Sequence, residues 1–246
     1  MTPIVVTLIH ATPAAMPPMA RALARVPEVR PLNLLDEALL AEVDRHGGLT
    51  TECRERMATH LTLAQQAGSR AVLVTCNIYS SVLDDLRPRF PDMPLVAVDQ
   101  AMLDLAVRSA QRIGVLATVA NGLRQQSDLL LDTAHRLGRE VKLTSVLRED
   151  AFAALVAGDG PRHDQILLEA LPPLARQVEV VVLAQASMGR LLDVLTEPQR
   201  AGVLASPDLA VAELARLLGL RVSSIASPAA VATKPLSALA EFLPGV

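Results

Sequence analysis

Short, continuous apolar runs separated by longer amphipathic stretches most limit the folds open to this chain. Runs such as Ala71–Thr75 and Val178–Leu183 lack the alternation of polar and apolar residues that marks a half-buried strand. Strands of this kind are buried on both faces, as in parallel sheets covered by helices. We therefore predict an α/β fold. The other expected strands are Ile4–Ile9, Leu95–Val98, Ile113–Thr118, Lys142–Val146, Gly202–Ala205 and Leu220–Ile225.

An internal repeat also emerges, because a shift of 109 residues aligns the chain with itself. Ile4-Val5-Val6 then falls on Ile113-Gly114-Val115, and Leu83-Asp84 falls on Leu192-Asp193. One offset without a gap across four strand–helix units predicts two pseudo-symmetric halves. We expect residues 1–110 to form the first half, with 211–246 packing back on it, and 111–210 to form the second. Ligands of open parallel sheets bind beyond the carboxyl ends of the strands, so the predicted site lies in the cleft between the halves.

Composition excludes several classes of partner. Charged residues make up 20% of the 246 residues and aromatic residues 2%, and the formal net charge is −3. A chain with few aromatic side chains and no basic stripe lacks the usual means of binding nucleic acid. Its apolar runs are too short to span a bilayer, and its N-terminus lacks the pattern of a signal peptide. We expect a cytoplasmic protein that binds neither nucleic acid nor membranes.

The two cysteines, Cys53 and Cys76, form neither a CxxC motif nor a metal-binding spacing. HExxH, Walker and GxGxxG motifs are also missing, so we expect no metal and no nucleotide cofactor. Cys53 lies in a charged helix expected at 51–66, where a structural role is the natural interpretation. Cys76 follows a buried strand and opens a helix, a position where backbone N–H groups favour the thiolate. The alternative is that Cys76 is a small buried apolar residue.

Polar residues that follow the predicted strands are the other candidates for a site. Asp99 is among them, and it would either orient a ligand or another side chain, or cap the helix that follows. His163 and Asp164 begin a helix after a loop, while His46, His60 and His135 lie in polar contexts typical of the surface. The candidates at strand ends are His10, Thr12, Thr75, Asn77, Thr118, Asn121, Gln185, Ala186 and Ser187.

The segment Val74-Thr75-Cys76-Asn77, with Ser80 and Ser81 behind it, resembles the first cysteine motif of the aspartate/glutamate racemase superfamily. This superfamily also holds hydantoin racemases, maleate isomerases and arylmalonate decarboxylases. The resemblance extends to Ile113–Thr118, whose final threonine matches one that helps to bind a carboxylate in the family. It also includes Val181–Gln185, which falls on the second cysteine motif. It implies two α/β halves and chemistry without a cofactor on a small carboxylate-bearing substrate.

The chain departs from the two-cysteine pattern at Gln185, which stands where the second thiol is expected. An amide is neither a general acid nor a general base near neutral pH, so two-thiol racemisation is not expected. His10 is one candidate for the missing proton-transfer partner, since its ordinary pKa is near 6.5. The alternative for His10 is a hydrogen-bonded histidine at a strand-to-helix turn.

The resemblance therefore implies a racemase- or isomerase-type enzyme that acts on an amino acid, a hydantoin or a dicarboxylate. Cys76 would be the thiol base or nucleophile, while Gln185 would donate a hydrogen bond at the second position. An arylmalonate-type decarboxylase is one alternative, and a non-catalytic protein that binds small carboxylates is another. A homodimer would be ordinary for such a fold.

Overall fold

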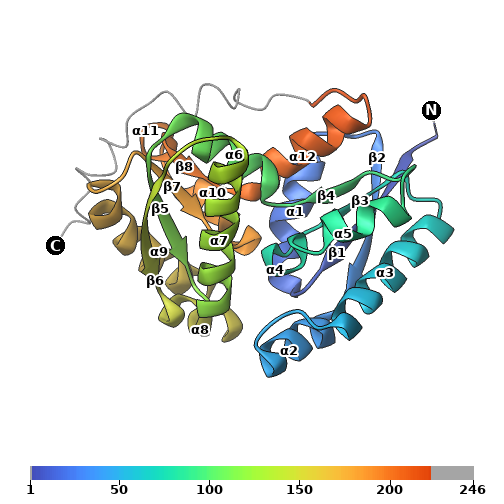
Figure 1. Ribbon diagram of the computed structural model, residues 1–246. Helices are drawn as coiled ribbons and strands as arrows, with labels where there is room; N and C mark the ends of the chain where they lie inside the picture. The colour runs from blue at the N-terminus through green and yellow to red at the C-terminus, as the bar shows by residue number, and fades with distance from the viewer. Residues whose placement is uncertain (1, 223–246) are drawn as a thin grey trace. The chain divides into compact units, whose positions relative to one another are not determined.

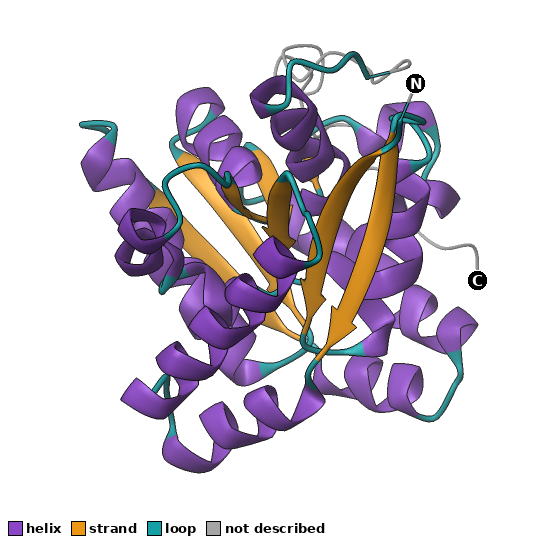
Figure 2. Ribbon diagram, turned by 90° about the vertical axis from the view of Figure 1, so that its right-hand side faces the viewer, coloured by secondary structure: helices purple, strands orange, loops and turns teal. Residues whose placement is uncertain are grey.

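The computed structural model describes residues 2–222. It contains two four-stranded parallel sheets flanked by helices (Figures 1 and 2). The predicted α/β fold with two parallel-sheet halves is confirmed. Contacts divide the described chain into two compact units, one of residues 2–101 with 207–222 and one of residues 102–206. The segment 227–246, which we expected to pack on the body, lies outside the described residues.

Unit 1 holds the sheet with strand order β2-β1-β3-β4. Its strands are β1 (Ile4–His10), β2 (Val29–Leu35), β3 (Ala71–Val74) and β4 (Leu95–Ala97). The helices are η1 (Pro13–Ala15), α1 (Met16–Leu23), α2 (Glu37–His46), α3 (Thr51–Gln66), α4 (Asn77–Ser80), α5 (Leu83–Leu86) and η2 (Arg87–Arg89). From residue 207 onward, α12 (Ser206–Leu217) also belongs to this unit.

Unit 2 holds the sheet with strand order β6-β5-β7-β8. Its strands are β5 (Arg112–Ala117), β6 (Lys142–Leu147), β7 (Val180–Leu183) and β8 (Val203–Leu204). From residue 102 onward, α6 (Gln100–Ser109) belongs to this unit. The remaining helices are α7 (Ala120–Arg136), α8 (Glu149–Val156), α9 (Gly160–Ala175), η3 (Ala186–Arg190), α10 (Leu191–Val194) and α11 (Glu197–Arg200).

Continuous apolar runs make up the middle strands of both sheets, as their burial requires. Every residue of β3 and of β7 is buried. In unit 1 the side chains of Val72 and Val74 pack with Met57 and Leu61 of α3. In unit 2, α9 packs closely against β5 at Gly114, because a Cβ added there would lie 3.0 Å from Leu174 of α9. These cores hold the ends of the strands, and the polar residues that follow them, in fixed positions.

Strand β2 was not predicted. Its sequence, Val-Arg-Pro-Leu-Asn-Leu-Leu, lies at the edge of the sheet, and most of its residues are exposed or partly exposed. Pro31 cannot donate to a ladder, which edge strands tolerate. The expected strand at 220–225 was wrong for its described part, since residues 220–222 are not in a strand. The rest of that segment is outside the described residues.

The two sheets share one strand order, but the offset between them is not a constant 109. Val6 lies opposite Ala71 in the first sheet, and Ile113 lies opposite Val180 in the second. Val6 and Ile113 are 107 residues apart in the sequence, whereas Ala71 and Val180 are 109 residues apart. The predicted offset therefore holds for β3 and β7, while β1 and β5 are shifted by two residues. The loops after β3 and β7 keep the offset, so Cys76 and Gln185 stand at equivalent positions.

Candidate active site

Cys76 lies two residues beyond the end of β3 and immediately before α4. Its backbone is extended, and its carbonyl oxygen accepts a hydrogen bond of 3.1 Å from the Tyr79 N–H. As a whole residue Cys76 is partly buried, whereas Cys53 on α3 is fully buried. The backbone N–H groups of Ile78 and Tyr79 are directed at the Cys76 sulfur and lower its pKa. Of the two cysteines, Cys76 is therefore the one placed at the carboxyl end of a strand.

The N–H groups at the helix start favour the Cys76 thiolate, as expected, but burial of the thiol opposes them. Burial raises the pKa of the thiol from 9.0 to about 12, and this effect outweighs the two N–H groups. The carboxylates of Asp99 and Asp44 raise the pKa further. With α4 only one turn long, few aligned peptide groups oppose this desolvation. The raised pKa favours the neutral thiol at neutral pH.

His10, at the end of β1, is completely buried, and both of its ring nitrogens have protein partners. Nδ1 lies 2.9 Å from the Thr75 hydroxyl, and Nε2 lies 3.0 Å from Asn33 Oδ1. Burial lowers the pKa of His10 below 6.5, so the neutral ring is favoured. This geometry fits the hydrogen-bonding interpretation better than proton transfer. Through these contacts His10, on β1, connects Thr75, beside Cys76, to Asn33 on β2.

Gln185 takes the equivalent position in unit 2 and is bound to Thr118 at the end of β5. Its Oε1 accepts hydrogen bonds from the Thr118 backbone N–H at 3.0 Å and from the Thr118 hydroxyl at 3.3 Å. The Gln185 Nε2 is buried and has no hydrogen-bond partner among the described residues. A Cβ added at Gly122 of α7 would lie 2.6 Å from that nitrogen. The amide group is therefore held in one orientation, with its nitrogen as the unused donor.

The other predicted site residues lie at these same strand ends. Thr12 precedes η1 and makes no capping hydrogen bond through its side chain. Asn77 is the buried first residue of α4, and Asn121 accepts a hydrogen bond of 2.9 Å from Arg124. Ala186 is buried and Ser187 is partly exposed, both in η3. Thr12, Thr75, Asn77, Cys76 and His10 thus belong to unit 1, and the remaining predicted residues belong to unit 2.

Sequence reasoning missed a buried carboxylate at the end of β2. Asp36 accepts two hydrogen bonds of 2.7 Å from Arg56 and one of 3.1 Å from the Leu39 N–H, and it lies 2.6 Å from His60 Nε2. His60 is therefore not the surface residue we expected. The hydrogen bonds from Arg56 and His60 hold the pKa of Asp36 below its usual value despite burial. Because β2 itself was not predicted, the only available signal was the Asp before a helical stretch.

A second buried network lies at the start of α9 in unit 2. His163 is completely buried, and its Nδ1 lies 2.8 Å from Asp164 Oδ1. The Arg190 guanidinium also binds the Asp164 carboxylate, at 2.9 Å. The Arg190 guanidinium packs against Gly160, since a Cβ at that position would lie 2.7 Å from it. The sequence singled out His163 and Asp164 but gave no sign of Arg190.

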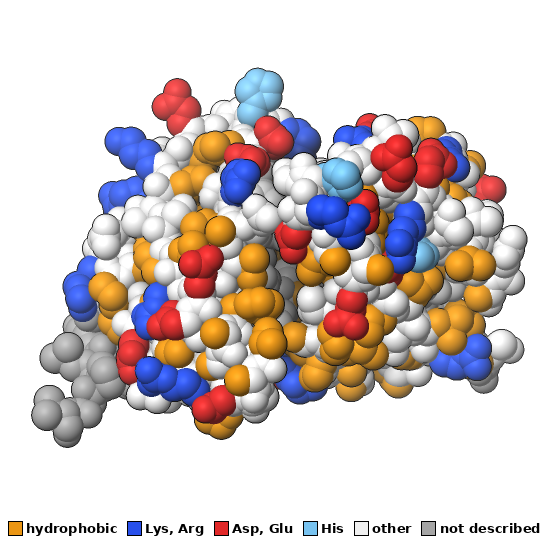
Figure 3. All heavy atoms as spheres, turned by 90° about the horizontal axis from the view of Figure 1, so that it is seen from below, with side chains coloured by type: hydrophobic (Ala, Val, Ile, Leu, Met, Phe, Trp, Pro, Cys, Tyr) orange, Lys and Arg blue, Asp and Glu red, His pale blue; other side chains and the backbone are white. Residues whose placement is uncertain are grey.

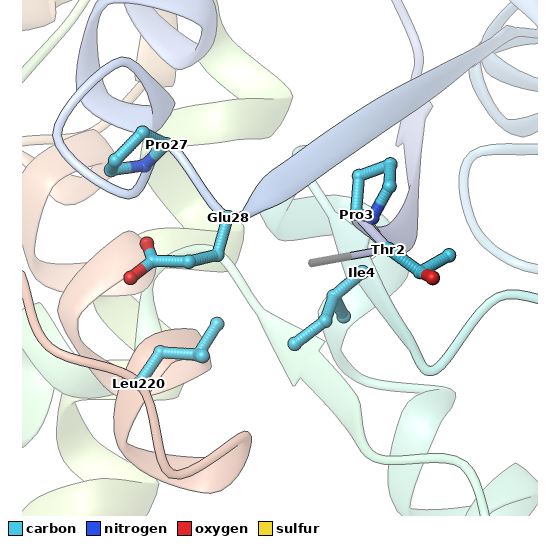
Figure 4. A pocket seen from close by; sticks show the side chains of 6 residues that line it. All are labelled: Thr2, Pro3, Ile4, Pro27, Glu28 and Leu220. Atoms are coloured by element: carbon cyan, nitrogen blue, oxygen red, sulfur yellow. The ribbon is translucent and has the colours of Figure 1, made fainter.

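Open cavities lie at the other ends of the strands. In unit 1 a cavity of about 300 Å³ opens at the amino end of β1 and is lined by residues that include Glu28 and Leu220 (Figure 4). In unit 2 a hollow of about 560 Å³ opens where β5 and β6 begin, beside Arg112 and Lys142. Ligands of parallel sheets bind at the carboxyl ends, where the polar groups described above gather. These cavities are therefore not the candidate active site.

Neither the surface charges nor any group of metal-binding side chains in the described residues indicates a further site. Acidic and basic side chains are interspersed on the face seen in Figure 3. Within residues 2–222, no group of three or more His, Cys, Asp and Glu side chains could hold a metal ion. No helix in that part of the chain is long and apolar enough to cross a membrane. The candidate chemistry thus rests on the side chains at the strand ends.

Residues 4–214 match the model of the Asp/Glu/hydantoin racemase family. The chain belongs to this family. It is 26% identical over 225 residues to glutamate racemase from Pseudomonas aeruginosa, a match that covers 89% of this chain and 83% of the relative. It is 30% identical over 163 residues to glutamate racemase from Vibrio vulnificus, covering 65% and 59%. The predicted family is confirmed, and membership identifies the chain as an isomerase.

Solved structures of racemases share the fold. A glutamate racemase from Bacillus anthracis matches with a TM-score of 0.65 and 19% identity, covering 89% of this chain and 83% of that one. The allantoin racemase from Klebsiella pneumoniae matches with a TM-score of 0.59 and 15% identity, covering 92% and 93%. The aspartate racemase from Picrophilus torridus matches with a TM-score of 0.65 and 11% identity, covering 89% and 96%. At these identities the likeness concerns the fold alone.

Proposed function

We propose that this chain is a cofactor-independent racemase or isomerase that uses Cys76 as its thiol base or nucleophile. The observation that carries the proposal is the position of Cys76, a partly buried residue at the carboxyl end of β3 and the start of α4, in a chain of the racemase family. The substrate would be a small molecule with a carboxylate, since the relatives are named for glutamate, aspartate and allantoin. Glutamate is the first substrate to test.

As a base, the Cys76 thiolate would take a proton from the carbon next to the substrate carboxylate. The C–H bond breaks, an S–H bond forms, and the electron pair moves into the carboxylate or carbonyl group. As a nucleophile, the same thiolate would instead add to an activated double bond. Asn77 follows Cys76 on α4 and would donate to the oxygen on which negative charge develops. Thr75, held by His10, would fix the start of this turn.

Gln185 would contribute a hydrogen bond rather than a proton. Its Oε1 is occupied by Thr118, which leaves Nε2 as a buried donor without a described partner. Thr118 would then position Gln185, while Ser187 and Asn121 would bind substrate oxygens. Because an amide does not titrate near neutral pH, substitution of Gln185 should weaken substrate binding without changing the pH profile of the reaction. A cytoplasmic location and a homodimer remain predictions from the sequence.

Proton NMR in D₂O tests the proposal. Wild-type protein should catalyse exchange of the Cα proton for deuterium, or loss of the substrate, in a panel of glutamate, aspartate, allantoin, hydantoins, maleate and substituted malonates. Cys76→Ala should slow that reaction by about 10³-fold, as expected for removal of an acid–base group. Cys53→Ala is the matched control, because it removes the buried cysteine of α3 and should leave the reaction within about twofold of wild type.

The outcomes separate the candidate reactions. Exchange that depends on Cys76 supports racemisation, and loss of maleate supports isomerisation through a thiol adduct. Release of CO₂ from a substituted malonate would instead favour the decarboxylase alternative. If Cys76→Ala retains the full rate on a substrate that wild type converts, Cys76 is not the reacting group and the proposal is wrong.

A further inference from the structure

Arg190 is a cation at the carboxyl edge of the second sheet that the proposed reaction leaves unused. It is the last residue of η3, which begins directly after Gln185. Helix α9 packs against β5 and β7 and ends at Ala175, shortly before β7 begins at Val180. The first turn of α9 therefore lies at the carboxyl edge of the sheet, in agreement with the contacts between Arg190 and Asp164.

Asp164 fixes the guanidinium group of Arg190 through a single nitrogen. Arg190 Nε lies 2.9 Å from Asp164 Oδ1 and 3.1 Å from Oδ2. The Asp164 side chain is 12% exposed, and Nδ1 of the completely buried His163 lies 2.8 Å from its Oδ1. A largely buried carboxylate held between two partners restricts the orientation of the guanidinium group that it binds. Arg190 is therefore held in place before any ligand arrives.

The other two guanidinium nitrogens, Nη1 and Nη2, have no hydrogen-bond acceptor among residues 2–222. The Arg190 side chain is 36% exposed and neither nitrogen is buried without a partner, so both reach solvent. They pack over the first residue of α9, since a Cβ at Gly160 would lie 2.7 Å from Nη2 and 2.8 Å from Nη1. The start of a helix favours a nearby anion and disfavours a cation. The free edge of this guanidinium group thus lies where negative charge is favoured.

Arg148, which follows β6 at the same edge of the sheet, has a partner for every guanidinium nitrogen. Its Nε and Nη2 donate to Asp150 at 3.0 and 2.8 Å, and its Nη1 donates to the Ile166 carbonyl at 3.2 Å. An arginine bound in this way joins parts of the chain and has no edge left for a ligand. Arg190 can still bind a planar carboxylate through two parallel hydrogen bonds.

We propose that the Nη1 and Nη2 edge of Arg190 is a carboxylate-binding site that holds a second carboxylate of the substrate. Each nitrogen donates to one carboxylate oxygen, while Asp164 keeps its place on Nε. The substrate is then a dicarboxylate, either an acidic amino acid or a dicarboxylic acid, rather than a hydantoin or allantoin. Arg190 selects this substrate, and Asp164 and His163 position Arg190. The inference rests on the proposed function, because it names the substrate class of the same enzyme.

Calorimetric titration of the full-length protein with succinate and glutarate, and with the monoamide of each acid, tests this site without turnover. A monoamide keeps the size of the diacid but lacks its second negative charge. Wild type should bind at least one diacid about tenfold or more tightly than its monoamide, as expected for hydrogen bonds between charged groups. Arg190→Gln should lose this preference, which leaves the diacid within about twofold of its monoamide.

Arg148→Gln is the matched control, because it removes a cation from the same edge that has no free nitrogen. It should leave the preference for the diacid within about twofold of wild type. Gly160→Ala is the second variant, and it keeps every charge if Arg190→Gln does not fold. Its added Cβ must displace the end of the Arg190 side chain, so the preference should fall by about threefold or more.

Steady-state kinetics with the substrate found for wild type give a second readout. A residue that binds the unreacting end of a substrate contributes equally to the ground state and the transition state. Arg190→Gln should therefore raise KM by about tenfold and change kcat by less than about threefold. A loss confined to kcat would overturn substrate binding by Arg190.

The titrations decide the proposal separately from the proposed function. Equal binding of diacid and monoamide by wild type, or binding of neither, would overturn it. A preference that survives in folded Arg190→Gln would also overturn it, as would loss of the preference in Arg148→Gln, which would show a general effect of positive charge. If the titrations support the site but wild type converts none of the tested substrates, the proposed function fails and the carboxylate site stands.

Discussion

His10 is a buried titratable side chain at the candidate site whose hydrogen bonds fit a structural interpretation. Its ring is completely buried, and both nitrogens are within hydrogen-bond distance of protein oxygens, on Thr75 and Asn33. In the neutral ring one nitrogen donates and the other accepts, so these two partners satisfy it. A second proton would have to be carried in a buried environment, which is why the pKa is lowered.

This placement predicts a stability effect with a defined pH dependence. His10→Ala leaves two polar groups without their partner and should lower the free energy of unfolding by about 1–3 kcal/mol at pH 7.5. Below pH 6.5 the unfolded chain protonates His10 while the folded protein resists it, so the His10 contribution declines as pH falls. The difference between wild type and variant should therefore shrink by at most about 1.4 kcal/mol per pH unit. Urea unfolding at pH 7.5 and 5.5 measures it.

His46→Ala is the control, since His46 is exposed on α2 and its ring lies 3.0 Å from Glu42 of the same helix. It should change stability by less than about 0.5 kcal/mol at either pH. A His10 variant with wild-type stability, but with one limb of the kcat/KM profile missing, would show that His10 transfers protons. That result would support the hypothesis that His10 is the second proton-transfer partner.

The sequence predicted the middle strands well because burial on both faces leaves a clear apolar run, as in β3 and β7. It missed β2, whose exposed edge and Pro31 give no such run. Without β2, the sequence analysis could not predict the contact between His10 and Asn33 or the ion pair between Asp36 and Arg56. Both join residues at least 20 positions apart, and no local pattern records such pairings. Cys76 and Gln185 were found because they directly follow predicted strands.

At the scale of an element, helix α7 is packed tightly onto the Gln185 amide at Gly122. Gly122→Ala places a Cβ 2.6 Å from Gln185 Nε2, while Oε1 is tied to Thr118. The amide must shift and strain its hydrogen bonds, so we expect a loss of about 1 kcal/mol in stability. In the Gln185→Ala background the clash is gone, and the higher helix propensity of alanine should make the same change neutral or stabilising by up to about 1 kcal/mol.

Thermal or urea unfolding of the four proteins in this double-mutant cycle gives the coupling energy. Leu123→Ala, one residue further along α7 and partly exposed, tests whether any change at this point of the helix has the same effect. If Gly122→Ala costs as much with Gln185 absent as with it present, the close contact does not determine the requirement for glycine. The orientation of the Gln185 amide would then need another cause.

At the scale of the whole molecule, two helices belong mainly to a different unit from the strand that they follow in the sequence. Helix α6 follows the last strand of the first sheet but belongs to unit 2 from residue 102, and α12 follows the last strand of the second sheet but belongs to unit 1 from residue 207. Four α12 side chains are almost fully buried, those of Ala210, Val211, Leu214 and Ala215. Arg25 and Asp208 also form an ion pair at 3.2 Å within unit 1. Within residues 2–222, unit 1 is thus made of two separate segments, whereas unit 2 is made of one.

This difference predicts different behaviour for fragments of the chain. Residues 100–206 hold all four strands of the second sheet and should fold alone, with helical circular dichroism and one cooperative urea transition. Residues 1–101 lack α12, whose apolar side chains are buried in the intact protein, so this fragment should not unfold cooperatively. Adding residues 207–222 through a short Gly/Ser linker should restore the transition. A cooperative fragment 1–101 without α12 would show that α12 is not required for the core of unit 1.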